Sequence, residues 1–216
     1  MGKRSRQEED VRNRTNASDP GMIELSDTKL RLLRPDLYGL HGLWRFLRWR
    51  LTSWFSWDER LHIKNQLMYG DSRAAVVVST FPLMVAAYTD ELDCVAILNF
   101  PDIVAEKYNL TEKSILLTVN YYMPGDEYAS DLIPGPKNTE TWANFHPLIA
   151  EFLTDDYARV KARKSQISRE EWERTYRMGK EYLKLRPWTA RDGSPIASSV
   201  PGITIDPSEY YRIANQ

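Results

Sequence analysis

The chain has 216 residues, a formal net charge of -1, 42% hydrophobic residues and 27% charged residues. This length suits one domain of about 100–200 residues with flanking segments, and the near-zero charge argues against a protein that coats nucleic acid over its whole surface. The single cysteine, Cys94, cannot form an internal disulfide, which excludes a small secreted scaffold held by such bonds.

The N-terminal residues 1–20 are polar and charged and carry almost no large apolar side chain. We expect a disordered arm here, because so few apolar groups cannot offset the entropy lost on ordering. A single domain is expected over residues 21–186. Alternating apolar positions in residues 22–34 favour a short strand or a docking segment, which Pro35 ends. No secretory leader and no apolar run of about 18 residues are found, so we expect a cytoplasmic protein without a transmembrane helix.

Residues 37–57, LYGLHGLWRFLRWRLTSWFSW, are the most unusual stretch. Wound as a helix, they gather their leucines with Trp44, Trp54 and Phe55 in an arc of about 120°. Phe46 and Trp49 fall outside this stripe, among arginines. The pattern predicts an amphipathic helix with aromatic rings on both sides.

Three interpretations of this helix stay open. Its stripe can pack on the protein's own sheet, with the arginines paired to acidic groups elsewhere. Tryptophan and arginine are also enriched at protein-binding hot spots. A basic helix with tryptophan and leucine can instead lie on a membrane surface, or stack on nucleic-acid bases.

A second helix is predicted over residues 57–69, because Ser56 and Glu59 have capping-box spacing and Gly70 suits a left-handed C-cap. Apolar runs rich in β-branched residues then predict four strands, at 74–80, 83–88, 94–100 and 115–123. Residues 89–93 should form a hairpin turn, and Pro82 should mark a break. A short helix over residues 101–109 should be capped by Asn99.

The C-terminal part begins with an irregular loop, residues 124–138, which holds three prolines and two glycines. Helical patterning resumes over residues 142–153, and Asp155 and Asp156 should cap a helix. A clear helix runs from Ser168, capped through Glu171, to about Leu185. Residues 187–216 should form an extended, proline-containing strap. The layout predicts an α+β fold: a small, mainly antiparallel sheet of about four strands over residues 74–123, packed against N-terminal and C-terminal helices.

No motif for metal, nucleotide or nucleophilic chemistry occurs, so we expect no cofactor and no metal site. The acidic residues of the 89–93 hairpin and the 124–138 loop are the best candidates for carboxylate chemistry. Turn geometry alone also favours acidic residues at such places. An enzyme is therefore not the leading expectation, and a motif-poor hydrolase using these carboxylates is kept as an alternative. It requires a concave pocket where the carboxylates meet a histidine or a basic group.

The sequence favours a non-enzymatic protein-interaction module, such as an adaptor or regulatory subunit. It would engage a protein partner through the Trp/Arg helix and the acidic hairpin. Peripheral membrane binding through residues 37–57 is a further alternative, and nucleic acid is not expected as a partner. The residues expected to bind the partner are Arg45, Phe46, Trp49, Arg50, Trp57, Asp90, Glu91 and Asp93.

Overall fold

A computed structural model describes residues 17–34, 37, 59–187 and 189–195. Most of the expected arm and strap, and all but Leu37 of the Trp/Arg helix, lie outside these residues. The described helices are α2 (Asp27–Leu33), α4 (Glu59–Tyr69), α5 (Asp102–Lys107), α6 (Tyr157–Lys164) and α7 (Arg169–Leu185), with a short 3-10 helix, η2 (Ala150–Phe152). The described strands are β1 (Asp71–Thr80), β2 (Leu83–Thr89), β3 (Cys94–Phe100), β4 (Ile115–Met123), β5 (Asn144–Ile149) and β6 (Arg191–Asp192).

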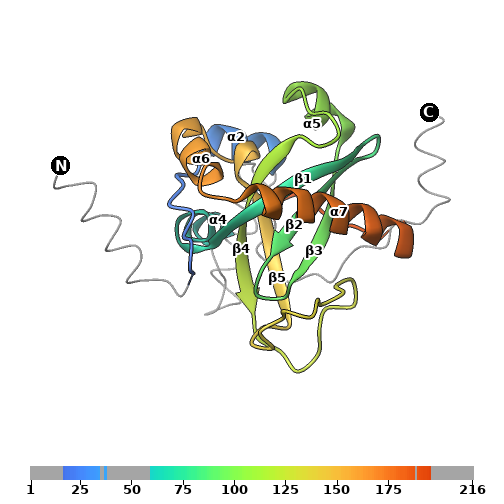
Figure 1. Ribbon diagram of the computed structural model, residues 1–216. Helices are drawn as coiled ribbons and strands as arrows, with labels where there is room; N and C mark the ends of the chain where they lie inside the picture. Colours follow the sequence, from blue (N-terminus) through green and yellow to red (C-terminus); the bar gives the residue numbers. More distant parts are fainter. Residues whose placement is uncertain (1–16, 35–36, 38–58, 188, 196–216) are drawn as a thin grey trace, which may run out of the picture.

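These elements form an α+β fold around a curled, half-barrel sheet (Figure 1). The strand order is β5-β4-β1-β2-β3-β6. Neighbouring strands are antiparallel except β3 and β6, which are parallel. Among the residues that the structure describes, no helix combines the length and the apolar character needed to cross a bilayer.

The four predicted strands are confirmed. The third and fourth have the predicted bounds, β2 is one residue longer, and β1 begins earlier, at Asp71. The hairpin is also confirmed, because β2 and β3 pair antiparallel from Leu83↔Phe100 to Thr89↔Cys94. These elements are short apolar runs bounded by polar turns, the pattern from which buried strands are best identified.

The prediction of about four strands is too low, and the helical interpretation of residues 142–153 is wrong. Residues 144–149 form β5, which pairs with β4 and lies at one edge of the sheet. In so short an apolar run, a strand buried on both faces cannot be told from a buried helix by periodicity. Pro147 lacks a backbone N–H, and an edge strand tolerates it because one side of its ladder has no partner strand.

Residues 22–34 do not form a strand either: helix α2 occupies residues 27–33. The Ser26 side chain caps it by accepting a hydrogen bond from the Lys29 N–H (3.4 Å). Leu30 is the buried residue of this helix. A seven-residue helix with one buried anchor gives too little periodicity to be found by pattern.

Two cap predictions are wrong and two are confirmed, and the predicted cap at Ser56 lies outside the described residues. Gly70 does not adopt the positive φ of a left-handed C-cap. Glycine is required there by close packing, because a Cβ would lie 2.6 Å from the Gln66 carbonyl oxygen and 2.7 Å from the Asn120 carbonyl oxygen. Asn99 lies within β3, and α5 begins after Pro101 without a side-chain cap. Asp156 and Ser168 cap α6 and α7 as predicted.

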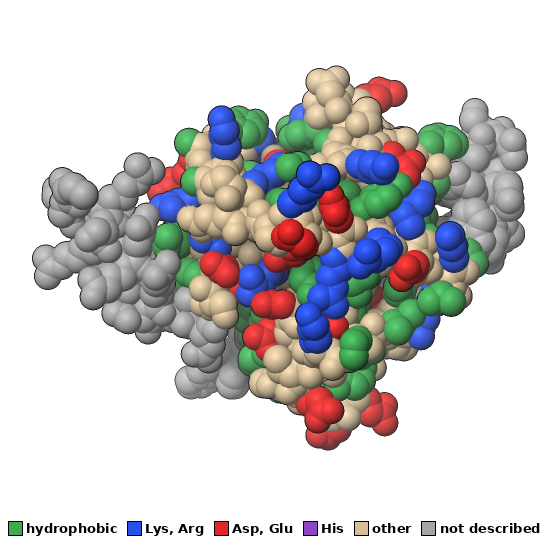
Figure 2. Space-filling model, in the orientation of Figure 1, with side chains coloured by type: hydrophobic (Ala, Val, Ile, Leu, Met, Phe, Trp, Pro, Cys, Tyr) green, Lys and Arg blue, Asp and Glu red, His purple; other side chains and the backbone are tan. Residues whose placement is uncertain are grey.

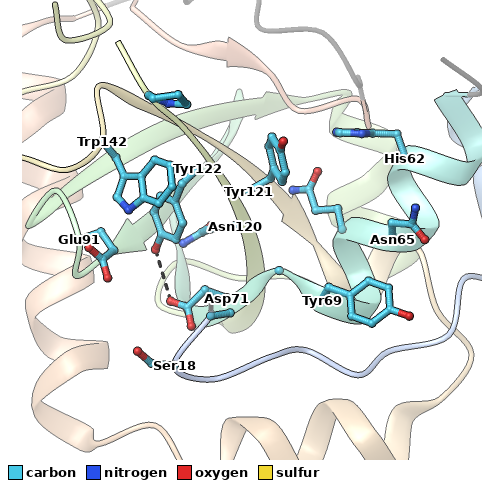
Figure 3. Close-up of a pocket in the computed structure, with 14 residues that line it drawn as sticks. Ser18, His62, Asn65, Tyr69, Asp71, Glu91, Asn120, Tyr121, Tyr122 and Trp142 are labelled. Carbon is cyan, nitrogen blue, oxygen red and sulfur yellow. Dashed lines mark hydrogen bonds between the residues drawn. The ribbon is translucent and has the colours of Figure 1, made fainter. Parts of the chain in front are cut away.

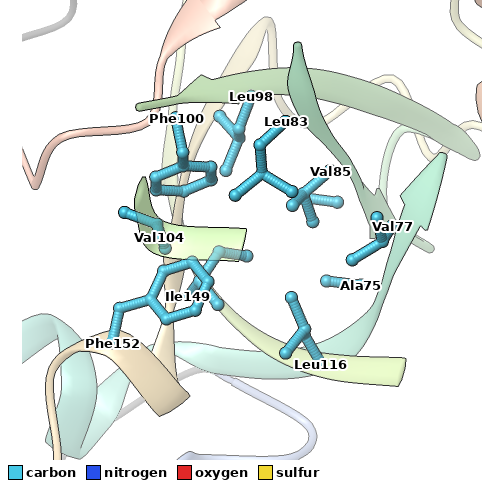
Figure 4. Close-up of a cluster of buried hydrophobic side chains, with 11 residues drawn as sticks. Ala75, Val77, Leu83, Val85, Leu98, Phe100, Val104, Leu116, Ile149 and Phe152 are labelled. Atoms are coloured by element: carbon cyan, nitrogen blue, oxygen red, sulfur yellow. The ribbon is translucent and has the colours of Figure 1, made fainter. Parts of the chain in front are cut away.

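The core lies on both faces of the sheet. On one face, buried strand residues such as Val85 and Leu98 meet Val104 of α5 and Phe152 of η2 (Figure 4). On the other face, α7 crosses the strands, and Gly179 lets it approach Ala86 closely (Figure 1). The molecular surface on the side of α7 carries basic and acidic side chains intermixed (Figure 2).

The two edges of the curled sheet are joined through Arg191 of β6. Its guanidinium donates to the Phe145 carbonyl and to Asn144 Oδ1 (2.8 Å), both on β5. It also forms a two-pronged ion pair with Asp131, at 2.7 and 2.9 Å, and both side chains are buried. One arginine thus ties both edge strands to the loop that precedes β5.

Candidate binding pocket

The first residues of β1 are not paired with β2. Their pairs run from Ala75↔Ala87 to Thr80↔Leu83, whereas β1 pairs with β4 from Asp71↔Asn120 onward. The segment before α2 lies beside the start of β1: Pro20 bridges to Asp71, and the Ser72 N–H donates to the Asp19 carbonyl (2.8 Å). This gap in the pairing leaves polar side chains gathered at one end of the sheet.

A cavity of about 470 Å³ lies at this end of the sheet, within the range of about 300–1,000 Å³ typical of small-molecule sites (Figure 3). Its described lining comes from the segment before α2, from α4, from the start of β1, from the 89–93 turn, and from β4 and the loop after it. Two regions differ in chemistry. The acidic end contains Asp71, Glu91, Tyr122 and Trp142, and the neutral end contains His62, Asn65, Gln66, Tyr69 and Tyr121.

A stacked aromatic pair forms one wall of the acidic end. The rings of Tyr122 and Trp142 have centroids 5.6 Å apart and planes inclined by 25°. The Tyr122 hydroxyl accepts a hydrogen bond from Thr89 Oγ1 (3.0 Å) and donates to Asp71 Oδ2 (3.3 Å; Figure 3). These two bonds fix the orientation of the tyrosine ring.

Asp71 is a buried carboxylate, with 2% of its surface exposed. It accepts hydrogen bonds from the Asp19 N–H (2.9 Å) and from Tyr122, and it pairs with Arg73 Nε (2.8 Å). Burial raises the pKa of Asp71 to about 6, because the loss of hydration outweighs the attraction of Arg73. The acidic end therefore contains a carboxylate that is ionised at pH 7 but poorly hydrated.

Negative charge is in excess around Arg73. Besides Asp71, its guanidinium pairs with Asp19 (3.1 Å) and Asp90 (2.5 Å). Asp19 also pairs with Arg163 (3.1 Å). Three carboxylates thus share two guanidinium groups, so this cluster contributes a net negative field at the acidic end.

The neutral end is built on α4. The His62 ring contacts Tyr121 edge to face, with centroids 5.1 Å apart, and burial lowers the pKa of His62. The imidazole is consequently uncharged at neutral pH. Gln66 is held by hydrogen bonds from its Nε2 to the carbonyl oxygens of Val119 (2.8 Å) and His146 (2.7 Å). This end offers polar contacts without formal charge.

The structure separates the three acidic residues predicted in the hairpin turn. Glu91 lines the pocket, and its Oε2 accepts a hydrogen bond from Thr139 Oγ1 (2.9 Å). Asp90 pairs with Arg73. Asp93 is buried, pairs with Arg174 and accepts a hydrogen bond from Tyr88 (3.2 Å).

The other predicted partner-binding residues, Arg45, Phe46, Trp49, Arg50 and Trp57, lie outside the described residues. The exposure expected of Phe46 and Trp49 is therefore not tested, and the partner site on this helix stays a prediction.

The pocket uses residues that the sequence did not single out, namely Asp71, Tyr122, Trp142 and His62. Asp71 stands at the start of an apolar strand, and nothing in the neighbouring sequence marks a single acidic residue there as part of a site. In the 124–138 loop, the acids also separate: Asp126 and Glu127 are exposed, whereas Asp131 pairs with Arg191. Within the described part of the chain, no three histidine, cysteine or acidic side chains gather in a way that suits a metal ion.

Comparison with known proteins found no similarity on which to base a function. No family model, no curated protein and no solved structure matches this chain. The geometry of the pocket is therefore the basis for a functional proposal.

Proposed function

We propose that this protein binds a small organic cation in the pocket between α4, β1 and β4. The observation that carries the proposal is the composition of the described lining: two carboxylates and four tyrosine or tryptophan rings, without a lysine or arginine. A cation is attracted both to negative charge and to the face of an aromatic ring. An anionic ligand would meet Asp71 and Glu91 without a basic group among these lining residues.

Binding, rather than catalysis, fits the state of the carboxylates. A general base must reach the proton that it removes from the substrate. Asp71 already accepts two hydrogen bonds and an ion-pair contact, and it is almost fully buried. Asp90 and Asp93 are each paired with an arginine. Asp71 and Asp90 belong to the cluster around Arg73 that keeps an excess of negative charge, and Asp93 is paired with Arg174 and does not line the pocket.

The proposal is compatible with an interaction module, because the cation can belong to a free molecule or to a partner. Recognition through the Trp/Arg helix remains part of that broader proposal. The hydrolase alternative requires a carboxylate that meets a histidine or a basic group; Glu91 and His62 line the same pocket, but at its opposite ends (Figure 3). Turnover that is lost in both Glu91→Gln and His62→Gln would favour the hydrolase.

Isothermal titration calorimetry with a panel of small cations tests the proposal. The panel contains choline, ethanolamine and guanidinium, together with 3,3-dimethyl-1-butanol, a neutral molecule with the shape of choline. At least one cation should bind, and the neutral molecule should bind more weakly. Glu91→Gln should weaken cation binding about 2- to 10-fold, because it removes a partly exposed charge from the pocket wall.

The matched control is Glu127→Gln, which removes an exposed carboxylate from the loop after β4 that does not line the pocket. It should leave the affinity unchanged. The proposal is wrong if none of the cations binds, or if the two charge-removing variants have equal effects.

A further inference from the structure

We propose that the preferred cation is a methylated ammonium group with no other charge, seated against the Tyr122 and Trp142 rings at the acidic end. This inference rests on the proposed function and names its ligand class. Three features of the pocket point to this ligand: the hydrogen-bonding state of the carboxylates, the aromatic wall and the sign of the lining charge.

The first feature is that the carboxylates are already engaged. Asp71 is bonded to the Asp19 N–H, to the Tyr122 hydroxyl and to Arg73, and only 2% of its surface is exposed. Glu91 accepts a hydrogen bond from Thr139. A guanidinium ligand is best held by two parallel bonds to both oxygens of one carboxylate; Asp71 is buried and bonded, and on Glu91 one oxygen, Oε2, already accepts from Thr139.

A primary ammonium ligand meets a related difficulty. Its three N–H donors lose water on entering the pocket, and unsatisfied donors are costly when buried. A trimethylammonium group has no N–H donor and carries its charge on a surface of methyl groups. It therefore gains from the negative field of Asp71 and Glu91 without requiring hydrogen bonds to either carboxylate.

The second feature is that the aromatic wall suits a methylated cation. Trp142 and Tyr122 form a stacked pair (5.6 Å between centroids), and Tyr122 is fixed by its hydrogen bonds to Thr89 and Asp71. Donation of its hydroxyl to a buried carboxylate makes the phenol ring more electron-rich. The stacked rings cover each other's facing sides, so a ligand can meet only a face that a ring turns away from its partner. Uncovered ring faces attract quaternary ammonium groups, and indole is the strongest of the side-chain rings.

The third feature is the sign of the lining charge. Both formal charges among the described lining residues, Asp71 and Glu91, are negative, and the neutral end adds uncharged groups such as His62 and Asn65. A carboxylate on the ligand would be repelled within the same cavity. The site should therefore select choline over glycine betaine, which has the same trimethylammonium group and an added carboxylate.

Calorimetry on the full chain compares choline with four relatives: ethanolamine, guanidinium, glycine betaine and 3,3-dimethyl-1-butanol. Choline should bind about 2- to 30-fold more tightly than its neutral analogue, the range expected for a cation on aromatic faces. It should also bind more tightly than ethanolamine, guanidinium and glycine betaine.

The result separates the two proposals. Tighter binding of ethanolamine or guanidinium overturns the methylated ligand and leaves cation binding in place. Equal binding of glycine betaine overturns the selection for net positive charge. Failure of every cation to bind overturns both proposals.

The variant Trp142→Leu should reduce choline affinity toward that of the neutral analogue, because leucine keeps an apolar wall but removes the ring face. Trp142→Phe is the matched control and should retain most of the affinity. Circular dichroism melting checks the fold of each variant. If Trp142→Leu does not fold, Glu91→Gln replaces it, and an unchanged preference for choline over the neutral analogue in that variant counts against the inference.

The trimethylammonium group can come from a free metabolite or from a lipid headgroup. Co-sedimentation with phosphatidylcholine vesicles, with and without free choline as competitor, distinguishes these sources. Pelleting that choline abolishes supports the methylated ligand and identifies the lipid. Choline binding without pelleting supports the same ligand as a soluble molecule.

Discussion

Replacing Arg191 with methionine should open the join between the two edges of the sheet. Arg191 and Asp131 keep only 6% and 5% of their side-chain surfaces exposed, and they form a two-pronged ion pair. The same guanidinium donates to Asn144 and to the Phe145 carbonyl of β5. Methionine fills a similar length but supplies none of these donors.

The expected loss of stability is large, because the substitution strands Asp131 as a buried charge. Breaking a buried ion pair from one side typically costs about 3–5 kcal/mol. A domain of this size has a free energy of unfolding of about 5–15 kcal/mol, so the loss should be a substantial fraction of the total. In the double variant with Asp131→Asn the neutral amide is easier to bury, so the second substitution should recover part of the loss.

Urea denaturation followed by circular dichroism measures these differences, and the single and double variants form a thermodynamic cycle. Arg169→Met is the matched control, because Arg169 pairs with Glu173 on the surface, where both side chains are largely exposed. It should leave the free energy of unfolding unchanged. A loss below about 1 kcal/mol for Arg191→Met, or no recovery in the double variant, would refute the reasoning about a buried, stranded charge.

Three further predictions concern single residues. Burial raises the pKa of Asp71 to about 6, so the stability that its protonation contributes is complete below about pH 4 and is lost as pH rises through 6. The free energy of unfolding of Asp71→Asn should therefore rise relative to that of the wild type by on the order of 2 kcal/mol between pH 4 and 8. Parallel pH profiles of the two proteins would contradict this. Gly179→Ala should destabilise by about 1–3 kcal/mol in urea, despite the better helix propensity of alanine, because the new Cβ would lie 2.6 Å from that of Ala86. Cys94 is 1% exposed and burial raises its pKa to about 12, so a thiol reagent should label it in urea but not in the native protein.

The parts of the fold that could be predicted are those whose signal is local. Strands β2, β3 and β4 are apolar runs bounded by turn residues, and α7 begins at a serine cap whose partner, Glu171, lies three residues on. Strand β5 was not predicted because its pairing with β4 decides its conformation. A short apolar run in the sequence carries no information about which strand will lie beside it. The same limit applies to β6, which consists of two residues.

The pocket could not be predicted for a related reason. Asp71, Trp142 and His62 each have an ordinary local setting, and they line one cavity only because β1 leaves β2 and lies beside residues 19–20. No spacing in the sequence encodes this arrangement. Among the described residues, the one predicted site residue that lines the pocket is Glu91, found because a hairpin turn between two apolar runs is a local pattern.

The acidic hairpin shows how distant partners decide the role of a side chain. From the sequence alone, Asp90 and Asp93 look like ordinary turn carboxylates. In the structure they pair with Arg73 and Arg174, which lie 17 and 81 residues away in the sequence. The pairing with Arg174 neutralises the charge of Asp93, whereas Asp90 shares Arg73 with Asp71 and Asp19, so its charge is only partly offset. Glu91, between them, has no arginine or lysine among its described ion pairs, so it keeps a net negative charge on the pocket wall. A function carried by this turn should therefore respond to Glu91→Gln, whereas changes at Asp90 or Asp93 should act first on stability.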